Sequence, residues 1–267
     1  MIIDSHTHIL PPDIIKRKDH YADKDLTFKT LFTAKNSTMA TAETLITTMD
    51  QHEISSAAVF GMGWKDNGLN SHVNDYIVES SLRYPERIYP FTGINPSSKK
   101  LGLQEAQRCL ELGVYGFGEV HAAFQNFDLG DKALMSEYMN LLEFNDLPIF
   151  IHCSEPVGHQ YPGKGDSGIK MIETLVNNFP NNKIVLAHWG GGLPFYTLMP
   201  EIGDALKNVY FDSAASTFLY SPRIFPVVNG LLGASKILFG TDYPLLNQNR
   251  VIDQIMDSNL SQKEKNA

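Results

Sequence analysis

The chain of 267 residues has 22 Lys and Arg against 30 Asp and Glu, a formal net charge of −8, and is 43% hydrophobic and 19% charged. This composition is typical of a folded globular protein rather than a disordered one. The acidic balance disfavours a duplex-DNA or anionic-membrane binder, because phosphates are neutralised by clustered Lys and Arg. No apolar run approaches the ~20 residues that span a bilayer. From the charge and the absence of such a run together, we expect neither a nucleic acid nor a membrane as partner.

The cysteines and the chain ends give expectations about the compartment. Cys109 and Cys153 lie far apart in the sequence and make no disulfide framework, and no signal-peptide pattern is present at the start. We therefore expect a cytoplasmic protein with reduced thiols. The stretch from Leu260 to Ala267 resembles the first turns of a helix that then stops, so the last helix is brief or the chain is shortened. Assembly into a homo-oligomer is left open.

Short apolar runs alternate with longer amphipathic stretches along the whole chain. Runs rich in Val, Ile, Phe and Tyr predict eight strands, at Ile2–Ile9, Ser55–Phe60, Ile88–Ile94, Val114–Val120, Pro148–Cys153, Lys183–His188, Val209–Asp212 and Lys236–Thr241. Helical spacing predicts eight helices, at Thr41–His52, Ser71–Arg83, Gln104–Leu112, Lys132–Phe144, Gly168–Phe179, Phe195–Leu206, Pro222–Leu232 and Gln248–Leu260. Eight alternating units predict a parallel sheet and are the number that closes a (β/α)8 barrel.

The alternative to a barrel is an open, doubly wound sheet, which serves fewer units equally well. Such a sheet is expected to have a glycine-rich phosphate turn after its first strand, and the residues from His6 to Pro12 do not form one. No linker-like change of composition divides the chain, so we predict a single α/β domain over residues 1–267, a TIM barrel. The polar segment 10–40 shows little helical pattern and is interpreted as an elaborated first βα loop, which in a barrel overhangs the active-site mouth.

Polar side chains occur at the carboxyl ends of strands that should otherwise be apolar. The first strand ends in two histidines spaced two apart, which places both imidazoles on one face. The complete set is His6, His8, Glu119, His152, His188 and Asp242. A single histidine at a strand end is more often a hydrogen-bonded structural residue, but chance placement of the whole set is improbable. Four imidazoles and two carboxylates at one rim predict a site for one or two divalent transition-metal ions.

Four motifs resemble, in order along the chain, those of the amidohydrolase superfamily. They are Asp4-Ser-His-Thr-His8, Ile149-Phe-Ile-His-Cys-Ser-Glu155, Leu186-Ala-His-Trp-Gly-Gly-Gly192 and Ile237-Leu-Phe-Gly-Thr-Asp-Tyr-Pro244. The chain is most similar to the amidohydrolase-2 branch, which includes relatives of aminocarboxymuconate-semialdehyde decarboxylase. The resemblance spans residues 4 to 244 and says little about the substrate.

The resemblance also implies roles for the polar residues. His6, His8 and Asp242 would ligate the more buried ion, and His152 would be a third imidazole ligand in a one-metal form. In a two-metal form, His152 and His188 would hold the second ion, and Glu119 has the position of a bridging carboxylate. The number of ions is left open. Zinc is the first expectation because His and carboxylate donors suit it, and manganese is the alternative.

The main functional hypothesis is metal-dependent hydrolysis of a small organic molecule with an amide, ester, lactone or similar carbonyl bond. A divalent ion lowers the pKa of water from 15.7 to ~7, Asp242 would carry the proton to the leaving group, and His188 would polarise the scissile bond. The alternative is a non-oxidative decarboxylase of a small carboxylic acid on the same scaffold; Glu119 favours hydrolysis. A nuclease of the TatD type and a catalytically silent metal-binding barrel are less favoured.

Further residues are predicted to lie around the proposed metal site. His121, Glu155, Tyr161 and Trp189 are expected to contact the substrate, with a surface loop or simple packing as the alternative for each. A ligand imidazole usually needs a hydrogen-bond acceptor behind it, and either Asp212 or Asp4 could supply one. Cys153 points away from His152 by strand parity and is expected to be a buried, inert thiol.

Overall fold

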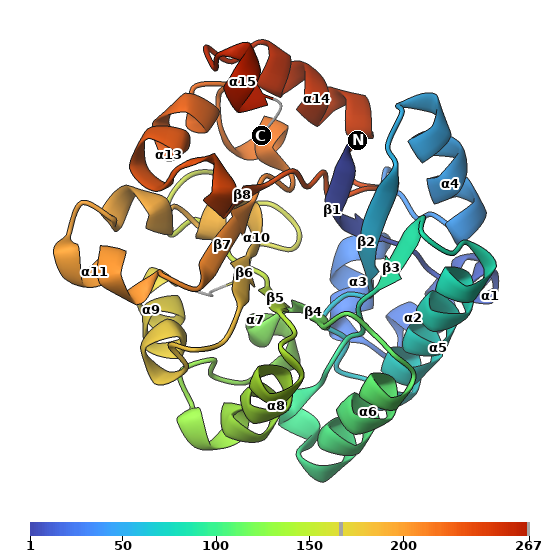
Figure 1. Cartoon of the computed structure of the whole chain (residues 1–267). Helices are drawn as coiled ribbons and strands as arrows, with labels where there is room; N and C mark the ends of the chain where they lie inside the picture. Colours follow the sequence, from blue (N-terminus) through green and yellow to red (C-terminus); the bar gives the residue numbers. More distant parts are fainter. Residues whose placement is uncertain (166–167, 266–267) are drawn as a thin grey trace.

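Parallel strands form the centre of the protein, and helices surround them (Figure 1). The computed structural model describes residues 1–165 and 168–265. The strands lie at the eight predicted places, and all but β7, which has its predicted bounds, are shorter than predicted: β1 Ile3–His8, β2 Ser56–Phe60, β3 Ile88–Pro90, β4 Phe117–Val120, β5 Ile149–Ile151, β6 Ile184–Leu186, β7 Val209–Asp212 and β8 Ile237–Leu238. Several predicted strands therefore end earlier, and their last polar residues belong to the loops at the carboxyl ends.

The strands follow one another in chain order around the ring. The paired strands form one sheet of β1, β2 and β3 and a second sheet from β4 to β8. Isolated parallel bridges cross both seams, from Thr92 to Phe117 and from Thr7 to Tyr243. The prediction of a (β/α)8 TIM barrel is confirmed, because all eight strands are parallel and in sequential order around the ring.

The outer helices correspond to the eight predicted amphipathic stretches: α4 Ala42–Gln51, α5 Asn67–Arg83, α6 Lys100–Glu111, α8 Lys132–Asn145, α9 Ile169–Asn178, α11 Pro200–Ala205, α13 Ile224–Leu232 and α14 Gln248–Met256. Helix α5 begins four residues before its predicted start because the Asp66 side chain accepts a hydrogen bond from the Leu69 N–H (2.7 Å). Short helices lie in the connections: α7 Ala122–Gln125, α10 Ala187–Gly190, α12 Ser216–Leu219, α15 Gln262–Lys265, η1 Pro96–Ser98, η2 Leu193–Tyr196 and η3 Ala234–Lys236.

The first βα connection differs from its prediction. Segment 10–40 is an elaborated connection that contains three short helices, α1 Pro12–Lys16, α2 Lys18–Ala22 and α3 Leu26–Phe32, which the sequence pattern did not indicate. Phe28 and Phe32 are buried and their rings lie 5.9 and 6.3 Å from the ring of Trp64. Helices this short are marginal alone, so tertiary packing of the aromatic rings, which a periodicity argument does not detect, stabilises them.

Aromatic side chains fill the barrel below its carboxyl-end rim. Phe60, Phe91 and Phe150 form a buried cluster with Ala58 and Val185. The Phe60 and Phe150 ring centroids lie 4.9 Å apart. The barrel interior is therefore a packed floor rather than a channel, and polar chemistry is confined to the rim above it.

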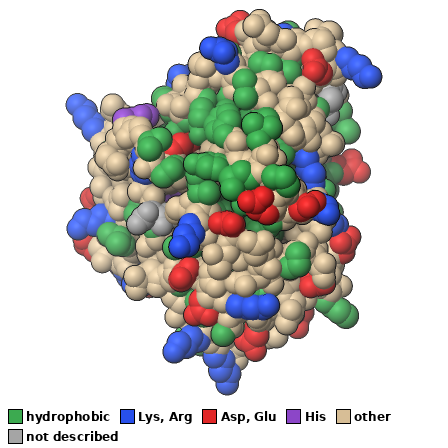
Figure 2. All heavy atoms as spheres, turned by 90° about the vertical axis from the view of Figure 1, so that its left-hand side faces the viewer, with side chains coloured by type: hydrophobic (Ala, Val, Ile, Leu, Met, Phe, Trp, Pro, Cys, Tyr) green, Lys and Arg blue, Asp and Glu red, His purple; other side chains and the backbone are tan. Residues whose placement is uncertain are grey.

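Apolar side chains also gather on one outer face (Figure 2). The face includes the region of α11 in Figure 1, and the segment before this helix exposes Phe195, Tyr196, Leu198 and Met199. In the part of the chain that the structure describes, no helix is both long and apolar enough to cross a bilayer. A cytoplasmic location stays a prediction, and assembly into a homo-oligomer stays open.

Candidate metal centre

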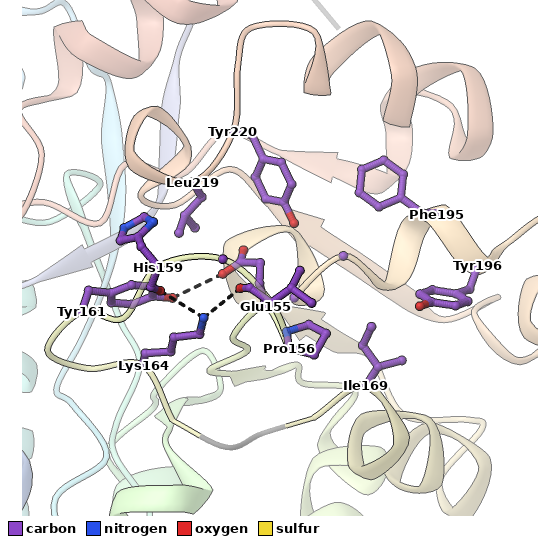
Figure 3. Close-up of a pocket in the computed structure, with 14 residues that line it drawn as sticks. Glu155, Pro156, His159, Tyr161, Lys164, Ile169, Phe195, Tyr196, Leu219 and Tyr220 are labelled. Carbon is purple, nitrogen blue, oxygen red and sulfur yellow. Dashed lines mark hydrogen bonds between the residues drawn. The ribbon is translucent and has the colours of Figure 1, made fainter.

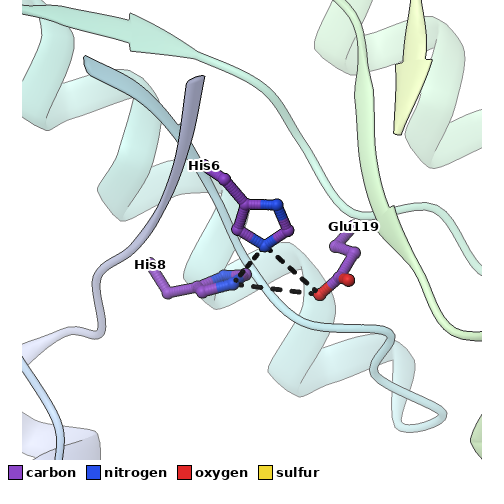
Figure 4. Close-up of side chains that lie close together, drawn as sticks. All are labelled: His6, His8 and Glu119. Carbon is purple, nitrogen blue, oxygen red and sulfur yellow. Dashed lines mark hydrogen bonds and ion pairs between the residues drawn. The ribbon is translucent and has the colours of Figure 1, made fainter. Parts of the chain in front are cut away.

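Two imidazoles from β1 point at each other (Figure 4), and His6 Nε2 lies 3.1 Å from His8 Nε2. The other nitrogen of each ring faces an acceptor: His6 Nδ1 lies 2.8 Å from Asp212 Oδ2, and His8 Nδ1 lies 3.2 Å from the carbonyl oxygens of Phe60 and Gly61. A neutral imidazole that donates from Nδ1 has its lone pair on Nε2. Two such lone pairs facing each other call for a cation between them, so the pair fits a divalent metal ion.

Glu119, on β4, lies between this histidine pair and a second one. Its Oε2 is 3.8 Å from the Nε2 atoms of both His6 and His8. Its Oε1 is 2.9 Å from His152 Nδ1 and 3.3 Å from His188 Nε2. The two groups of donors that can hold an ion, His6–His8–Glu119 and Glu119–His152–His188, therefore share one buried carboxylate.

A hydroxyl and a backbone carbonyl orient the second histidine pair. His152 Nε2 lies 3.1 Å from Ser154 Oγ, which also accepts a hydrogen bond from the Gly165 N–H (3.2 Å). His188 Nδ1 lies 3.1 Å from the carbonyl oxygen of Ala214. With those partners accepting, His152 presents Nδ1 and His188 presents Nε2 toward Glu119.

Asp242 completes the floor of the site from the loop after β8. Its Oδ1 lies 3.2 Å from His8 Nε2 and 3.8 Å from His6 Nε2. Asp242 (φ 66°) and His188 (φ 55°) both have left-handed backbones, which are uncommon for residues other than glycine. Both are held through their backbone N–H groups: Asp242 N–H donates to the His6 carbonyl (2.9 Å), and His188 N–H donates to the side-chain Oδ1 of Asp212 (2.9 Å).

The structure decides between the two aspartates proposed to support a ligand imidazole. Asp212 accepts from the His6 ring and also from the N–H groups of His188 and Ala214. Asp4 instead accepts from the hydroxyl of Thr241 (2.6 Å) and the amide of Gln248 (3.1 Å). Asp212 is therefore the carboxylate behind the imidazole, whereas Asp4 ties β1 to the β8 loop and α14.

The carboxylates stabilise positive charge among these imidazoles. Burial alone would lower the pKa of His6, but Asp212, Glu119 and Asp242 raise it to about 9. Burial would also lower the pKa of His188, but the carboxylates, Glu119 above all, outweigh burial and raise this pKa to about 10. Burial would raise the pKa of Glu119, but His152 and His188 hold it well below its usual range. The same field that holds protons here would favour a divalent cation in their place.

These groups form the floor of a cavity of about 400 Å³. His8, Glu119, His152, His188 and Asp242 lie on the floor. The walls are mainly apolar and come from five connections: Leu31, Phe32, Met62, Pro162, Ala215, Phe218, Leu219, Pro244 and Leu245. The predicted substrate contacts His121 and Tyr161 also line this cavity. The cavity thus has a polar floor that can bind a cation and an apolar upper part.

The comparisons with known proteins agree with this architecture. The amidohydrolase family model matches residues 3–267. The chain belongs to the amidohydrolase family. The resemblance noted in the sequence, to the amidohydrolase-2 branch of that superfamily, is thereby confirmed.

Two curated relatives of this amidohydrolase are decarboxylases by name. The chain is 20% identical to a gamma-resorcylate decarboxylase from Polaromonas sp., over 74% of this chain and 73% of the relative. It is 23% identical to a 2-amino-3-carboxymuconate-6-semialdehyde decarboxylase from Dictyostelium discoideum, over 71% of this chain and 60% of the relative. The chain thus spans less than two thirds of the length of the second relative.

A solved structure confirms the fold of the amidohydrolase barrel. The 5-carboxyvanillate decarboxylase from Novosphingobium aromaticivorans, crystallised with manganese and 4-hydroxy-3-methoxy-5-nitrobenzoic acid, aligns with a TM-score of 0.75 at 17% identity. The alignment covers 99% of this chain and 92% of that protein. At this identity the likeness shows the fold alone.

The other two residues predicted to contact the substrate, Glu155 and Trp189, do not line this cavity. Glu155 lines a second pocket beside the cavity and not the cavity itself. Trp189 has no exposed surface; its Nε1 donates to Ser216 Oγ (3.0 Å) and its ring packs on Phe225. The expectation that Trp189 contacts the substrate is therefore wrong, because the left-handed turn at His188 directs the next side chain into the packing below α13 and α14.

Sequence reasoning missed two kinds of residue at this site. Ser154, which orients His152, lies inside one of the recognised motifs, and its alternation with His152 along the strand was the available indication. The apolar walls, such as Leu31, Phe218 and Leu245, belong to loops with no motif or periodicity. Only the fold brings these distant loops together.

The His121 ring stacks against one of the proposed metal ligands. Its ring stacks on His152 (centroids 4.0 Å apart, planes 13° apart) and on Phe124 (4.2 Å, 18°). Its Nε2 lies 3.0 Å from the Gly163 carbonyl. Burial, together with the charge of His152, lowers the pKa of His121 to about 3. His121 is thus a neutral aromatic wall of the cavity.

Proposed function

We propose that this amidohydrolase is a metal-dependent, non-oxidative decarboxylase of a small aromatic carboxylic acid. The observation that supports this best is the cavity, which has an imidazole and carboxylate floor under apolar walls. A flat ring fits between such walls, and its carboxylate would face the floor. No Lys or Arg is among the described residues lining this cavity, so the floor is the place where a carboxylate finds positive charge. The curated relatives named as decarboxylases support the same choice.

The residues proposed to hold the ion are His6, His8 and Asp242, with Glu119, His152 and His188 beside them. A divalent ion bound there would supply positive charge to the substrate carboxylate or a neighbouring hydroxyl. Manganese is now the first choice, because the Novosphingobium decarboxylase contains it. Zinc, expected first from the donor types, is the alternative. Reconstitution of the metal-free protein with each ion, followed by turnover and metal content, decides between them.

The chain's own residues can perform the proton transfer that decarboxylation needs. The bond between the ring carbon and the carboxylate carbon breaks, carbon dioxide leaves, and the electron pair remains on the ring carbon. That carbon takes a proton, which we assign to the Asp242 carboxyl on the cavity floor, and solvent restores it. His188, anchored through Nδ1 to the Ala214 carbonyl, would orient the substrate carboxylate through Nε2. The apolar walls would exclude water from the carbanion-like carbon.

Product chemistry tests this proposal. The metal-loaded protein is incubated with a panel of hydroxybenzoates, lactones, amides and esters in H₂¹⁸O and, separately, in D₂O. We expect carbon dioxide release, one deuterium at the former carboxyl carbon, and no ¹⁸O in the aromatic product. Hydrolysis of an amide, ester or lactone with ¹⁸O in the product, and no carbon dioxide release, would overturn it.

Hydrolysis is the second candidate function, and one observation favours it. Glu119 is shared by two groups of donors, and a shared carboxylate is what a pair of metal ions needs. Two metal ions per chain in the purified protein, together with incorporation of ¹⁸O from water into the product, would favour hydrolysis over decarboxylation. In both cases the proposed partner is a small molecule.

A further inference from the structure

A second pocket of about 300 Å³ lies beside the metal cavity (Figure 3). His159, Tyr161 and Leu219 line both. Its other walls come from the loop after β5, from the glycine turn after β6 and from the segment around η2 and α12. We call it the Glu155 pocket. None of the proposed metal ligands lines it, so its chemistry is separate from the metal centre.

Glu155 supplies a carboxylate with an unsatisfied oxygen in this pocket. Its Oε2 accepts a hydrogen bond from the Tyr161 hydroxyl (3.3 Å). Its Oε1 is buried and has no hydrogen-bond partner of good geometry among the described residues, although the Tyr220 hydroxyl also interacts with this carboxylate. A buried carboxylate oxygen without a donor is costly. The pocket therefore offers one strong acceptor position for a group that brings its own N–H or O–H.

Aromatic side chains line the same pocket (Figure 3): Tyr161, Phe195, Tyr196 and Tyr220. Burial and then the negative charge of Glu155 raise the pKa of Tyr161 to about 12, and the same two causes raise that of Tyr220. Both hydroxyls stay protonated, so the carboxylate provides the negative charge of the pocket. A carboxylate among aromatic faces is the environment that organic cations prefer.

The ammonium group of Lys164, which also lines the pocket, is hydrogen-bonded to backbone carbonyls and not to Glu155. Lys164 Nζ donates to the carbonyl oxygens of Val157 (2.8 Å) and His159 (3.1 Å), and it lies 5.7 Å from the Tyr161 ring centroid. No ion pair joins it to Glu155 in the part of the chain that the structure describes. Lys164 thus stabilises the loop after β5 through these hydrogen bonds and does not neutralise the Glu155 carboxylate by a direct ion pair.

We propose that the Glu155 pocket binds an organic ammonium group, with Glu155 Oε1 accepting its N–H and the surrounding rings packing against its carbon atoms. The class of ligand is a primary amine, protonated at neutral pH and attached to an apolar body. The proposal stands apart from the decarboxylase proposal, because it uses none of the metal ligands.

Calorimetric titration of the metal-loaded protein with benzylamine and with benzyl alcohol tests the proposal. The two probes share their shape and differ in the charged donor. We expect benzylammonium to bind about tenfold more tightly or better, since a hydrogen bond to a charged group is among the stronger ones. Removal of the metal with a chelator should leave this preference unchanged. Equal binding of the two probes, no binding of either, or loss of the preference with the metal would overturn the proposal.

The variant Glu155→Gln localises the effect, because it keeps the shape of the side chain and removes the charge. We expect it to abolish the preference for the amine while binding of benzyl alcohol stays within about twofold. The matched control is Glu201→Gln, which removes the same charge from an exposed position on α11 and should retain the preference. A preference that persists in Glu155→Gln contradicts the proposal. If that variant does not fold, the comparison of the two probes on the wild-type protein still decides.

Discussion

The two histidine pairs at the metal centre differ in how firmly they are held. In the β1 pair, each Nδ1 faces an acceptor on another strand or the loop that follows it, and both rings pack edge-on against Phe60 (4.8 and 5.3 Å). In the β5–β6 pair, His188 also has its Nδ1 3.1 Å from a carbonyl of another loop, that of Ala214, whereas His152 relies on the Ser154 hydroxyl two residues away. The first pair is therefore preorganised for an ion, whereas the second pair can adjust at His152 to what is bound.

The largest expected effect on metal binding comes from removing one imidazole from each pair. His8→Ala should lower metal affinity by at least about a hundredfold, because it removes a ligand from the preorganised half. His152→Ala should lower it by about tenfold. Metal content after competition with a graded chelator measures both.

An imidazole outside the ligand set provides the control for this comparison. His159 lines the cavity without approaching the ligand groups, so His159→Ala should retain the metal. An equal loss of metal from His8→Ala and His152→Ala would contradict the difference between the two pairs.

The second prediction separates metal retention from turnover within the preorganised half. Asp242→Asn keeps the size and shape of the side chain and removes the proton donor. We expect most of the metal to remain and kcat to fall by about 10²–10⁴-fold, the usual contribution of a positioned acid. Metal analysis and turnover on the same preparation give both values. Near-normal turnover would remove Asp242 from the proposed proton transfer.

The same difference explains what the sequence could predict. His6 and His8 are two residues apart on a strand, so their common face follows from strand geometry. The meeting of Glu119 with both pairs depends on barrel closure, which the eight alternating units predicted. The choice between substrate contact and simple packing for Trp189 could not be made from its place after His188, because both residues have left-handed backbones. The helices of segment 10–40 were missed because buried aromatic contacts, rather than periodicity, stabilise them.

The third prediction concerns the groups behind the ligands. Asp212→Asn weakens the hydrogen bond to His6 and removes a charge that stabilises the cation, so metal affinity should fall by about 10–100-fold. Ser154→Ala removes the acceptor behind His152 and should cost less than about tenfold. Competition with a metal-sensitive dye gives both affinities. If Ser154→Ala proves as damaging as Asp212→Asn, then His152 is held as firmly as His6.

The smallest expected effect comes from His121, whose ring stacks on His152 in the adjustable half. His121→Phe keeps a flat ring against His152 and Phe124, so metal affinity and KM should stay within about threefold of wild type. His121→Ala removes the stack, which is worth about 0.5–1.5 kcal/mol, and should weaken metal binding by up to about tenfold. Dye competition and steady-state kinetics measure the two variants. If the Phe variant loses as much as the Ala variant, then the contact of His121 Nε2 with the Gly163 carbonyl, rather than its flat ring, positions His152.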